Sequence, residues 1–325
     1  MKKYRIGIVG VSGYGGGEAL RLCVNHPHFE VVYVSGESSA GTKLAERFPS
    51  LPEPVASLVI AKWDPAALPP LDMLFASLPT GESTDSLAKV PADVRIVDIG
   101  GDHRFKPGWV YGLADVWPDR IRGATRVANP GCYPAATLSA LAPLFAGKLV
   151  SPHDVIIDAK SGVSGAGRGG GGSNFGYSEV NEDVAAYALL KHAHVPEMNA
   201  ALSELCGGNV SVVFTPHLIP MTRGILSTIY LKGKLTTEQC LSAARSFYKD
   251  RPSVKVTEKP PHTKWALGTN QVFISYAADA GRELVVALGA IDNLGKGAAG
   301  QAVQNANLML ELEATIGLEG VALWP

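Results

Sequence analysis

The sequence predicts an α/β protein in which a doubly wound parallel sheet is followed by an α+β domain with a mixed or antiparallel sheet. Three observations support this prediction. A glycine-rich turn joins a first apolar run to a first helical pattern, short apolar runs then alternate with helical segments, and longer β-rich stretches dominate from about residue 151. Strands that alternate with helices are typical of a parallel sheet. A chain of 325 residues is also long enough for about two domains.

The first domain is expected to span residues 1–131 and to bind a dinucleotide. Its strands are predicted from short apolar runs bounded by turn residues, a pattern typical of buried parallel strands. A helical pattern at 18–25 follows the glycine-rich turn. The runs that we expect to form strands are 4–9, 29–34, 73–77 and 95–99.

The second domain is expected to span residues 132–297 and to carry catalysis, substrate binding and oligomerisation. Its expected strands are 154–158, 210–215, 226–231, 271–276 and 283–289, and its expected helices are 197–205 and 237–248. An amphipathic helical pattern at 298–316 follows a glycine-bearing loop. We expect this C-terminal helix, within the segment 298–325, to return to the first domain and complete it.

Composition excludes several classes of protein. The chain has 29 Lys and Arg against 30 Asp and Glu, without a basic or acidic block, so neither nucleic acid nor an anionic membrane surface is an expected partner. No apolar window approaches the length of a membrane span. The four cysteines lie far apart, without metal-ligand spacing, so we expect no metal site, no disulfide scaffold and a cytoplasmic location.

The segment GVSGYGGGE, residues 10–18, has the position of a dinucleotide-binding turn in a Rossmann-like domain. It lies between the first strand and the first helix, where small residues let the backbone approach a pyrophosphate and the helix N-terminus stabilises its charge. Glycine spacing alone is a weak signal, and its place between strand and helix strengthens it. The residues expected to contact the cofactor here are Gly10, Ser12, Gly13, Tyr14, Gly15 and Gly16.

The end of the second strand bears on which dinucleotide binds. It reads VSGESSAGTK, residues 34–43. Glu37 offers a carboxylate for the ribose diol of NAD, whereas Ser35, Ser38, Ser39 and Lys43 offer hydroxyls and a cation for the 2′-phosphate of NADP. The hydroxyls and the cation favour NADP(H).

The segment ANPGCYPAATL, residues 128–138, places Cys132 between a turn and a predicted helix. Pro134 suits the first turn of a helix, where its missing N–H is not needed. A cysteine at a helix N-terminus has a stabilised thiolate and is a candidate nucleophile. Cys23, Cys206 and Cys240 lack such a setting, and we expect them to be ordinary packed residues.

A thiolate nucleophile needs an acid–base partner. The segment FTPHLIPMTRG, residues 214–224, places His217 after an apolar strand and between two prolines, which favours it as that partner. Arg104, Arg168 and Arg223 each lie beside a glycine or a turn and are candidates for holding phosphate or a substrate carboxylate. The glycine-rich segment 164–177 is predicted to be a mobile loop.

Taken together, the glycine turn, NPGCYP and TPHLIPM resemble the N-acetyl-γ-glutamyl-phosphate reductase family of arginine biosynthesis. The segments DAKSGVSGAGR, HAHVPEM and AIDNLGKGAAGQAVQNANLM also resemble that family in the same order, so the likeness covers nearly the whole chain. The resemblance implies an NADP-dependent oxidoreductase with a Rossmann-like domain and an α+β domain, assembled as a dimer or tetramer.

The resemblance also implies roles for individual residues. Cys132 is then the nucleophile and His217 the catalytic histidine, and Asn293 falls where the family closes on the nicotinamide. Further expected cofactor contacts are Pro79, Ser161 and Gly162, and His194 and Glu197 are expected to line the substrate site. The sequence departs from the family pattern at Thr80, His103 and Ala114-Asp115, and its second-strand loop lacks the arginine often found near the 2′-phosphate.

The expected reaction is reduction of an acyl phosphate to an aldehyde through a thioester on Cys132, with release of inorganic phosphate. Alternatives of the same class are aspartate-semialdehyde dehydrogenase and a reductase of aminoadipyl phosphate. A cysteine hydrolase or acyltransferase without a nucleotide, and an NADP-sensing module without catalysis, are alternatives of other classes. The glycine turn disfavours the hydrolase, and a helix N-terminal cysteine disfavours the sensor.

Overall fold

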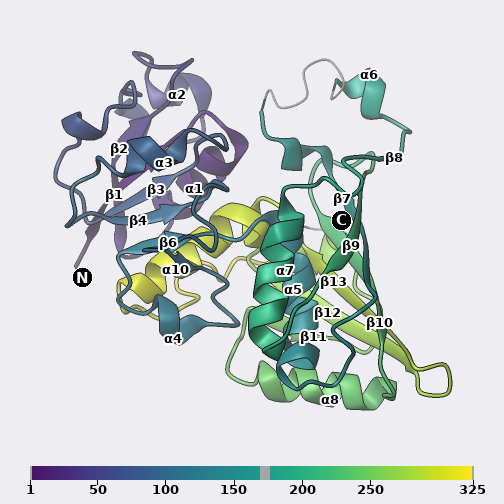
Figure 1. Cartoon of the computed structure of the whole chain (residues 1–325). Coiled ribbons are helices and arrows are strands. Elements are labelled where there is room, and N and C mark those ends of the chain that lie inside the picture. Colours follow the sequence, from purple (N-terminus) through teal and green to yellow (C-terminus); the bar gives the residue numbers. More distant parts are fainter. Residues whose placement is uncertain (1, 169–175, 324–325) are drawn as a thin grey trace. The chain divides into compact units, whose positions relative to one another are not determined.

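The computed structural model describes residues 2–168 and 176–323. It divides into two compact units, one formed by residues 2–130 and 298–319 and the other by the described parts of 131–297 together with 320–323 (Figure 1). The segment 169–175, which belongs to the predicted mobile loop 164–177, lies outside the described residues. No helix in the described residues is both long and apolar enough to cross a membrane.

Unit 1 contains a six-stranded parallel sheet of order β2-β1-β3-β4-β6-β5, as predicted for a doubly wound fold. The strands are β1 (Tyr4–Val9), β2 (Phe29–Ser35), β3 (Met73–Ala76), β4 (Arg95–Asp98), β5 (Val110–Tyr111) and β6 (Arg126–Ala128). The helices of its first 130 residues are α1 (Tyr14–Val24), α2 (Leu44–Arg47), α3 (Ser83–Leu87) and α4 (Pro118–Ile121), with short 3₁₀ turns at Val55–Ser57 and Pro65–Ala67.

Alternation along the strands builds two apolar clusters on opposite faces of this sheet. On β3, Phe75 packs into the cluster that contains α1, whereas Leu74 packs into the cluster that contains Leu87 of α3. Successive strand residues point to opposite faces, so a strand that is apolar throughout is covered on both sides. This burial explains why these short runs carry no polar alternation.

The C-terminal helix is shorter than the predicted pattern 298–316. A π-helical turn at Gly295–Ala299 leads into α10 (Gly300–Met309). Glu311 has a φ of +59°, which ends the helical path, and the Asn307 side chain donates to the carbonyls of Ala314 and Ile316. Every residue of α10 is buried, so the helix is buried on all sides rather than amphipathic.

Unit 2 contains a seven-stranded mixed sheet of order β11-β12-β13-β10-β7-β9-β8, in which β7–β9 and β11–β12 are parallel pairs. The strands are β7 (Val155–Ser161), β8 (Ala185–Ala186), β9 (Val212–Leu218), β10 (Ile225–Lys232), β11 (Val254–Val256), β12 (Val272–Asp279) and β13 (Leu284–Ile291). The helices are α5 (Cys132–Ala146), α6 (Tyr177–Val180), α7 (His194–Cys206), α8 (Thr237–Phe247) and α9 (Thr263–Ala266), with a 3₁₀ turn at Val163–Ala166.

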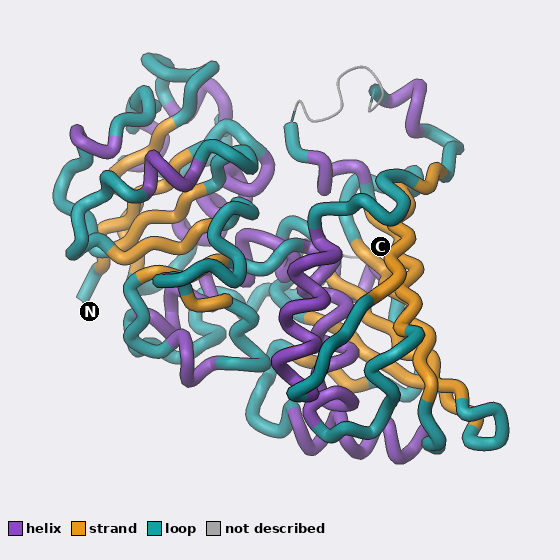
Figure 2. The backbone as a smooth tube through the Cα atoms, viewed as in Figure 1, coloured by secondary structure: helices purple, strands orange, loops and turns teal. Residues whose placement is uncertain are grey.

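Helix α5 lies against one face of this sheet, beside α7 (Figure 2). Gly289 of β13 permits the approach, because a Cβ at that position would be 2.4 Å from the carbonyl oxygen of Ala136. The Thr137 hydroxyl lies 2.9 Å from that of Ser227 on β10. These contacts fix the axis of α5 and therefore the place of its first residue, Cys132.

The opposite face of the sheet is covered less. Val155 and Ile157 of β7 are fully buried, whereas Ile156 between them is 44% exposed. Ile156 pairs in register with Val213 and Tyr230, which are 45% and 39% exposed. We call Ile156, Val213 and Tyr230 the open-face patch.

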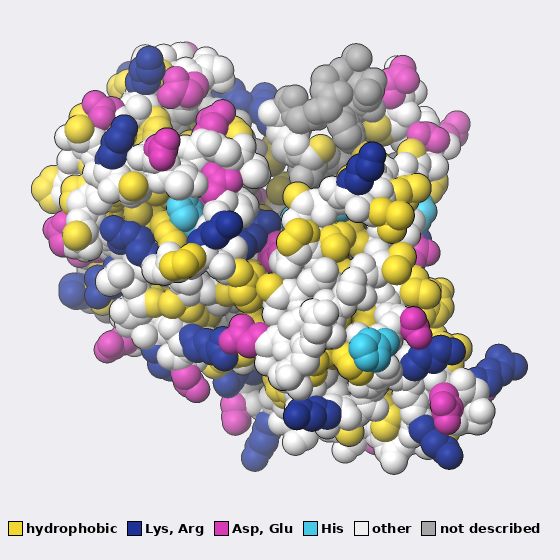
Figure 3. Space-filling view, in the orientation of Figure 1, with side chains coloured by type: hydrophobic (Ala, Val, Ile, Leu, Met, Phe, Trp, Pro, Cys, Tyr) yellow, Lys and Arg dark blue, Asp and Glu magenta, His cyan; other side chains and the backbone are white. Residues whose placement is uncertain are grey.

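Charges of both signs intermingle on the surface shown in Figure 3. This pattern fits the balance of 29 basic and 30 acidic side chains.

Candidate active site

The glycine turn of unit 1 is built as close backbone packing. Gly10 has a φ of +75°, and a Cβ there would be 2.1 Å from the carbonyl oxygen of Ser77. A Cβ on Gly16 would be 2.2 Å from the carbonyl oxygen of Gly10. Helix α1 begins at Tyr14, four residues before the predicted start, with Gly13 as its N-cap. The predicted contacts Tyr14, Gly15 and Gly16 therefore lie in the first turn of the helix, where backbone N–H groups can face an anion.

The end of β2 supports this turn. The carbonyl oxygen of Ser35 accepts hydrogen bonds from the N–H groups of Gly10 and Val11, and Ser35 is fully buried. Ser38 is exposed, and the Ser39 hydroxyl contacts the hydroxyl of Ser12. Of the two predicted serine contacts, Ser38 is thus accessible to a ligand and Ser35 holds the turn.

A second loop at the carboxyl edge of the unit 1 sheet begins with exposed Pro79. The Asp102 carboxylate accepts hydrogen bonds from the N–H groups of Gly81 and Ser83, at 2.7 and 3.0 Å. Partial burial raises the pKa of Asp102 and is the largest single influence on it. The hydrogen bonds from Gly81 and Ser83 together outweigh this effect, so the pKa lies below its ordinary value. Arg104 donates from Nε to the carbonyl oxygen of Asn129, at 2.9 Å, at the end of β6.

In unit 2, Cys132 is the first residue of α5 and Gly131 is its N-cap, as the sequence predicted for a helix-terminal cysteine. None of the four cysteines forms a disulfide. The N–H groups of Cys132 and Tyr133 belong to the first turn, whereas Pro134 has no N–H. Gly297 lies against the cysteine, because a Cβ there would be 2.9 Å from the Cβ of Cys132.

The first turn of α7 contacts the residue before the cysteine twice. The Gly131 N–H donates to Oε1 of buried Glu197, at 2.8 Å. A Cβ on Gly131 would be only 2.3 Å from Nε2 of His194. The imidazole of His194 therefore packs directly on the peptide that precedes Cys132.

Cys132 and His194 line the same cavity of about 240 Å³, which lies entirely within unit 2. Ser161, a predicted contact, also lines it. His194 was predicted from the sequence, whereas His192, Tyr133 and Tyr187 were missed, although His192 of HAHVPEM and the tyrosine beside Cys132 were visible signals. The remaining lining residues are Tyr133, Gly165, Ala166, Tyr187, His192 and Leu218.

Two tyrosines and a histidine line this cavity with hydrogen-bonded polar groups. Tyr187 donates to the hydroxyl of Tyr133, at 3.1 Å, and Tyr133 donates to the carbonyl oxygen of His217, at 3.3 Å. Burial raises the pKa of Tyr187 to about 12 and raises that of Tyr133 as well, so both remain protonated at neutral pH. Burial lowers the pKa of His192, whose Nδ1 accepts from the His194 N–H at 3.1 Å.

His217 does not line this cavity. It lies on β9 with its Nδ1 3.1 Å from Oδ1 of Asp158 on the neighbouring strand β7. Cys132 therefore shares a cavity with His194, and the side chain of His217, the predicted acid–base partner, faces Asp158.

The other predicted residues of unit 2 lie outside the cavity lining. Arg223 forms an ion pair with fully buried Asp292, with Nε 2.9 Å from Oδ2. Asn293 accepts from the Gly224 N–H and donates to the Ser164 hydroxyl, so its amide joins two loops. Gly162 donates to the carbonyl oxygen of Gly224. Arg168 is exposed.

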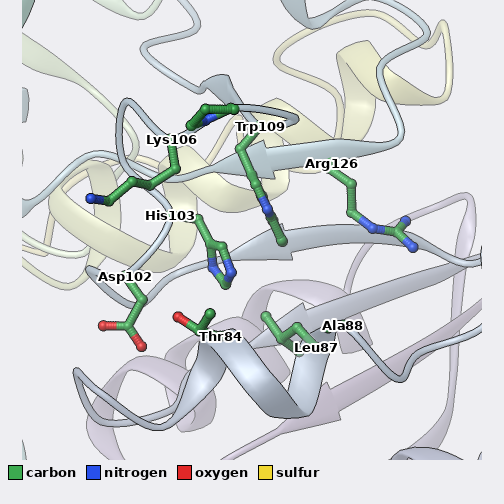
Figure 4. Close-up of a pocket in the computed structure, with 9 residues that line it drawn as sticks. Thr84, Leu87, Ala88, Asp102, His103, Lys106, Trp109 and Arg126 are labelled. Carbon is green, nitrogen blue, oxygen red and sulfur yellow. The ribbon is translucent and has the colours of Figure 1, made fainter.

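Unit 1 has a separate cavity of about 590 Å³ between α3 and the segment 102–109 (Figure 4). His103 lines it, with Nδ1 2.6 Å from Oδ2 of fully buried Asp98 and with its ring stacked on Trp109. The departure at His103 thus forms a buried hydrogen-bond contact with Asp98. None of the residues predicted for catalysis or for cofactor and substrate binding lines this cavity.

Comparisons with known families agree with this two-unit arrangement. Residues 5–124 match the profile of the semialdehyde dehydrogenase NAD binding domain, and residues 132–293 match that of the semialdehyde dehydrogenase dimerisation domain. Two solved aspartate-semialdehyde dehydrogenases share the fold at a TM-score of 0.75. The enzyme from Vibrio cholerae is 16% identical, covering 96% of this chain and 99% of that one, and the Candida albicans enzyme, solved with NADP, is 17% identical, covering 97% and 100%.

Curated relatives are much closer in sequence. An N-acetyl-gamma-glutamyl-phosphate reductase of Bradyrhizobium sp. (strain ORS 278) is 63% identical over 322 residues, which is 99% of both chains. A reductase of the same name from Dehalococcoides mccartyi (strain BAV1) is 43% identical over the full length of both chains. With a helix-terminal cysteine in one unit and a dinucleotide turn in the other, this chain is an oxidoreductase that belongs to the N-acetyl-γ-glutamyl-phosphate reductase family.

Proposed function

We propose that this protein reduces N-acetyl-γ-glutamyl phosphate to N-acetylglutamate semialdehyde with NADPH, through a thioester on Cys132. The observation that carries the proposal is the place of Cys132, at the N-terminus of α5 and in one cavity with His194. A helix N-terminus stabilises a thiolate, and a neighbouring imidazole supplies the acid–base partner that the chemistry needs.

The first half of the reaction uses this thiolate. Its sulfur attacks the acyl carbon, the sulfur–carbon bond forms, the bond from that carbon to the phosphate oxygen breaks, and inorganic phosphate leaves. The N–H groups of Cys132 and Tyr133 lie in the first turn of α5, where backbone N–H groups point out of the helix N-terminus and can stabilise the oxyanion of the tetrahedral state. His194 supplies the proton for the departing phosphate.

The second half releases the aldehyde. When bound, NADPH supplies the hydride that reduces the thioester carbon. The carbonyl of the aldehyde then re-forms, the sulfur–carbon bond breaks, and the electron pair returns to the Cys132 sulfur. Because the hydroxyls of Tyr133 and Tyr187 stay protonated, they place no second negative charge beside the Cys132 thiolate.

The glycine turn supports the cofactor assignment. The first turn of α1 offers N–H groups to the pyrophosphate. The hydroxyls of Ser12 and Ser39 meet beside the end of β2 and suit a 2′-phosphate, whereas Glu37 is the carboxylate that would suit the ribose diol of NAD. No carboxylate occurs in the first turn of α1 to oppose an anion.

The open-face patch supports assembly as a homodimer. Ile156, Val213 and Tyr230 lie on strands within residues 132–293, the range that matches a dimerisation domain. A row of exposed apolar side chains on neighbouring strands forms a surface that a second copy of the same chain can cover.

The decisive test is the reverse reaction with purified protein, NADP⁺ and inorganic phosphate, supplied in turn with N-acetylglutamate semialdehyde, aspartate semialdehyde and aminoadipate semialdehyde. We expect phosphate-dependent turnover with the first substrate. Preference for another semialdehyde would identify one of the related reductases. Hydrolysis without a nucleotide would indicate a cysteine hydrolase, and NADP binding without any turnover would indicate a sensor.

Cys132→Ala should abolish this turnover while the affinity for NADP⁺ stays unchanged in a binding titration. His194→Asn should lower kcat by about 10²–10⁴-fold, the usual contribution of a general acid–base group. His217→Asn is the matched comparison, because its imidazole contacts Asp158 outside the cavity. If His217→Asn loses the larger share of kcat, His217 is the proton partner and the assignment of His194 is wrong.

A further inference from the structure

Arg47 reaches the dinucleotide turn from helix α2. Its Nη2 donates to the carbonyl oxygen of Ser12, at 2.8 Å, across 35 residues of sequence. The hydroxyl of Ser12 in turn contacts the hydroxyl of Ser39, which follows β2. One guanidinium and two hydroxyls therefore meet where the turn, the end of β2 and the end of α2 come together.

A side chain at Gly36, the first residue after β2, would crowd the hydroxyls of Ser12 and Ser39. A Cβ on Gly36 would be 2.6 Å from the hydroxyl oxygen of Ser12 and 3.3 Å from that of Ser39. Ser35, the last residue of β2, is fully buried. An enzyme that selects NAD commonly holds the ribose diol with a carboxylate at the end of this strand. Ser35 and Gly36 carry no carboxylate there, and Glu37, which follows them, has an exposed side chain.

The groups that remain suit a phosphomonoester. A guanidinium carries five N–H donors in a planar fork, so a contact to the Ser12 carbonyl is compatible with a bidentate contact to phosphate. Hydroxyls can add further donors to the same oxygens. The expected arginine is missing from the second-strand loop, and Arg47 supplies the same charge from the following helix.

We propose that Arg47, Ser12 and Ser39 form the subsite for the 2′-phosphate of the adenosine ribose and that Arg47 sets the preference for NADP(H) over NAD(H). This inference rests on the proposed function, because it concerns the cofactor of that reaction. It assigns the selectivity to a residue outside the 34–43 loop that the sequence pointed to.

The direct test uses fragments that differ only in the phosphate of interest. Adenosine 2′,5′-bisphosphate and adenosine 5′-monophosphate are titrated calorimetrically into the wild-type protein and into Arg47→Gln, Arg47→Lys and Arg122→Gln. We expect Arg47→Gln to weaken the bisphosphate by about tenfold or more, as for loss of a charge-assisted bidentate contact, and to change the monophosphate less than about twofold. Arg47→Lys should retain part of the preference.

Arg122→Gln is the matched control, because it removes one arginine charge from an exposed part of unit 1. It should leave both affinities unchanged. If Arg47→Gln weakens both fragments equally, Arg47 only supports the turn through Ser12 and the proposal is overturned. An unchanged ratio between the fragments overturns it as well.

Steady-state kinetics separates this inference from the proposed function. In Arg47→Gln the KM for NADPH should rise while kcat at saturation and the kinetics with NADH stay close to wild type. A wild-type protein without reductase activity that still prefers the bisphosphate would refute the reaction and retain the subsite. An active enzyme whose KM for NADPH is unaffected by Arg47→Gln would retain the reaction and refute the subsite.

Discussion

His26 is buried, although its position in the sequence predicts an exposed side chain. It follows α1 at a place where a solvated loop histidine is the ordinary expectation, yet it is only 2% exposed and its ring stacks on Phe29 at 3.7 Å between centroids. Its Nδ1 accepts from the His28 N–H. Burial lowers the pKa of His26 from 6.5 to about 4, because the charged imidazolium loses its hydration.

This lowered pKa predicts a loss of stability in mild acid. Between pH 6.5 and about 4 the unfolded chain binds a proton at His26 and the folded chain does not, so the free energy of unfolding falls as pH falls through this window. The full difference amounts to about 3 kcal/mol at 1.36 kcal/mol per pKa unit. Urea denaturation of His26→Gln at pH 7 and pH 5 should show a smaller difference than wild type. The exposed-site variant His153→Gln serves as control, and an identical pH dependence in His26→Gln would contradict the prediction.

At the scale of elements, the reactive cysteine depends on the junction between α5 and α7. The sequence predicted a helix after the NPGCYP turn and a helix at 197–205, and both are present as α5 and α7, although α7 begins three residues earlier, at His194. That the first turn of one helix packs on the N-cap of the other depends on tertiary contacts that no local pattern encodes. The sequence favours His217 from its rigid strand-end setting, whereas the contact of His194 with the residue before Cys132 is visible only in the structure.

Gly131→Ala tests this junction. The φ of −68° and ψ of 159° at Gly131 accept an alanine without backbone strain, so the effect comes from the added methyl, which would be 2.3 Å from Nε2 of His194. We expect the imidazole to be displaced and kcat to fall by about tenfold or more, since small misplacements of catalytic groups are costly. Gly281→Ala in the β12–β13 hairpin is the matched control. Equal kcat values for the two variants would show that His194 tolerates displacement.

Element prediction succeeded where a pattern extended over enough residues. The longer strands of both sheets appear close to their expected bounds, because alternation or continuous apolarity over six to eight residues is a clear signal. The short strands β5, β6, β8 and β11 have only two or three residues each and carry no periodicity to detect. Helix α10 ended early because its stop depends on a left-handed residue, Glu311, rather than on glycine or proline.

At the scale of the whole molecule, the open-face patch predicts a dimer that one charge can disrupt. Ile156→Glu places a carboxylate at the centre of the patch, where burial against a second copy would leave it without hydration. Light scattering after gel filtration should find a dimeric wild type and a largely monomeric variant with an unchanged circular dichroism spectrum. Val59→Glu, at an exposed apolar position of unit 1, should remain dimeric. A monomeric wild type, or a dimeric Ile156→Glu, would exclude this interface.

The two segments that form unit 1 are separated in the sequence by nearly all of unit 2, which affects how unit 1 folds during synthesis. Its main apolar cluster joins Ile6, Ile8 and Phe75 to Val303 and Met309 of α10. A ribosome that has synthesised only the first 130 residues has produced every strand of the unit 1 sheet but not the helix that completes its core. Nearly all of unit 2 is contiguous and emerges in the interval. Nascent unit 1 therefore exposes apolar surface until residues 298–319 are synthesised, and this interval is when the chain has most need of a chaperone.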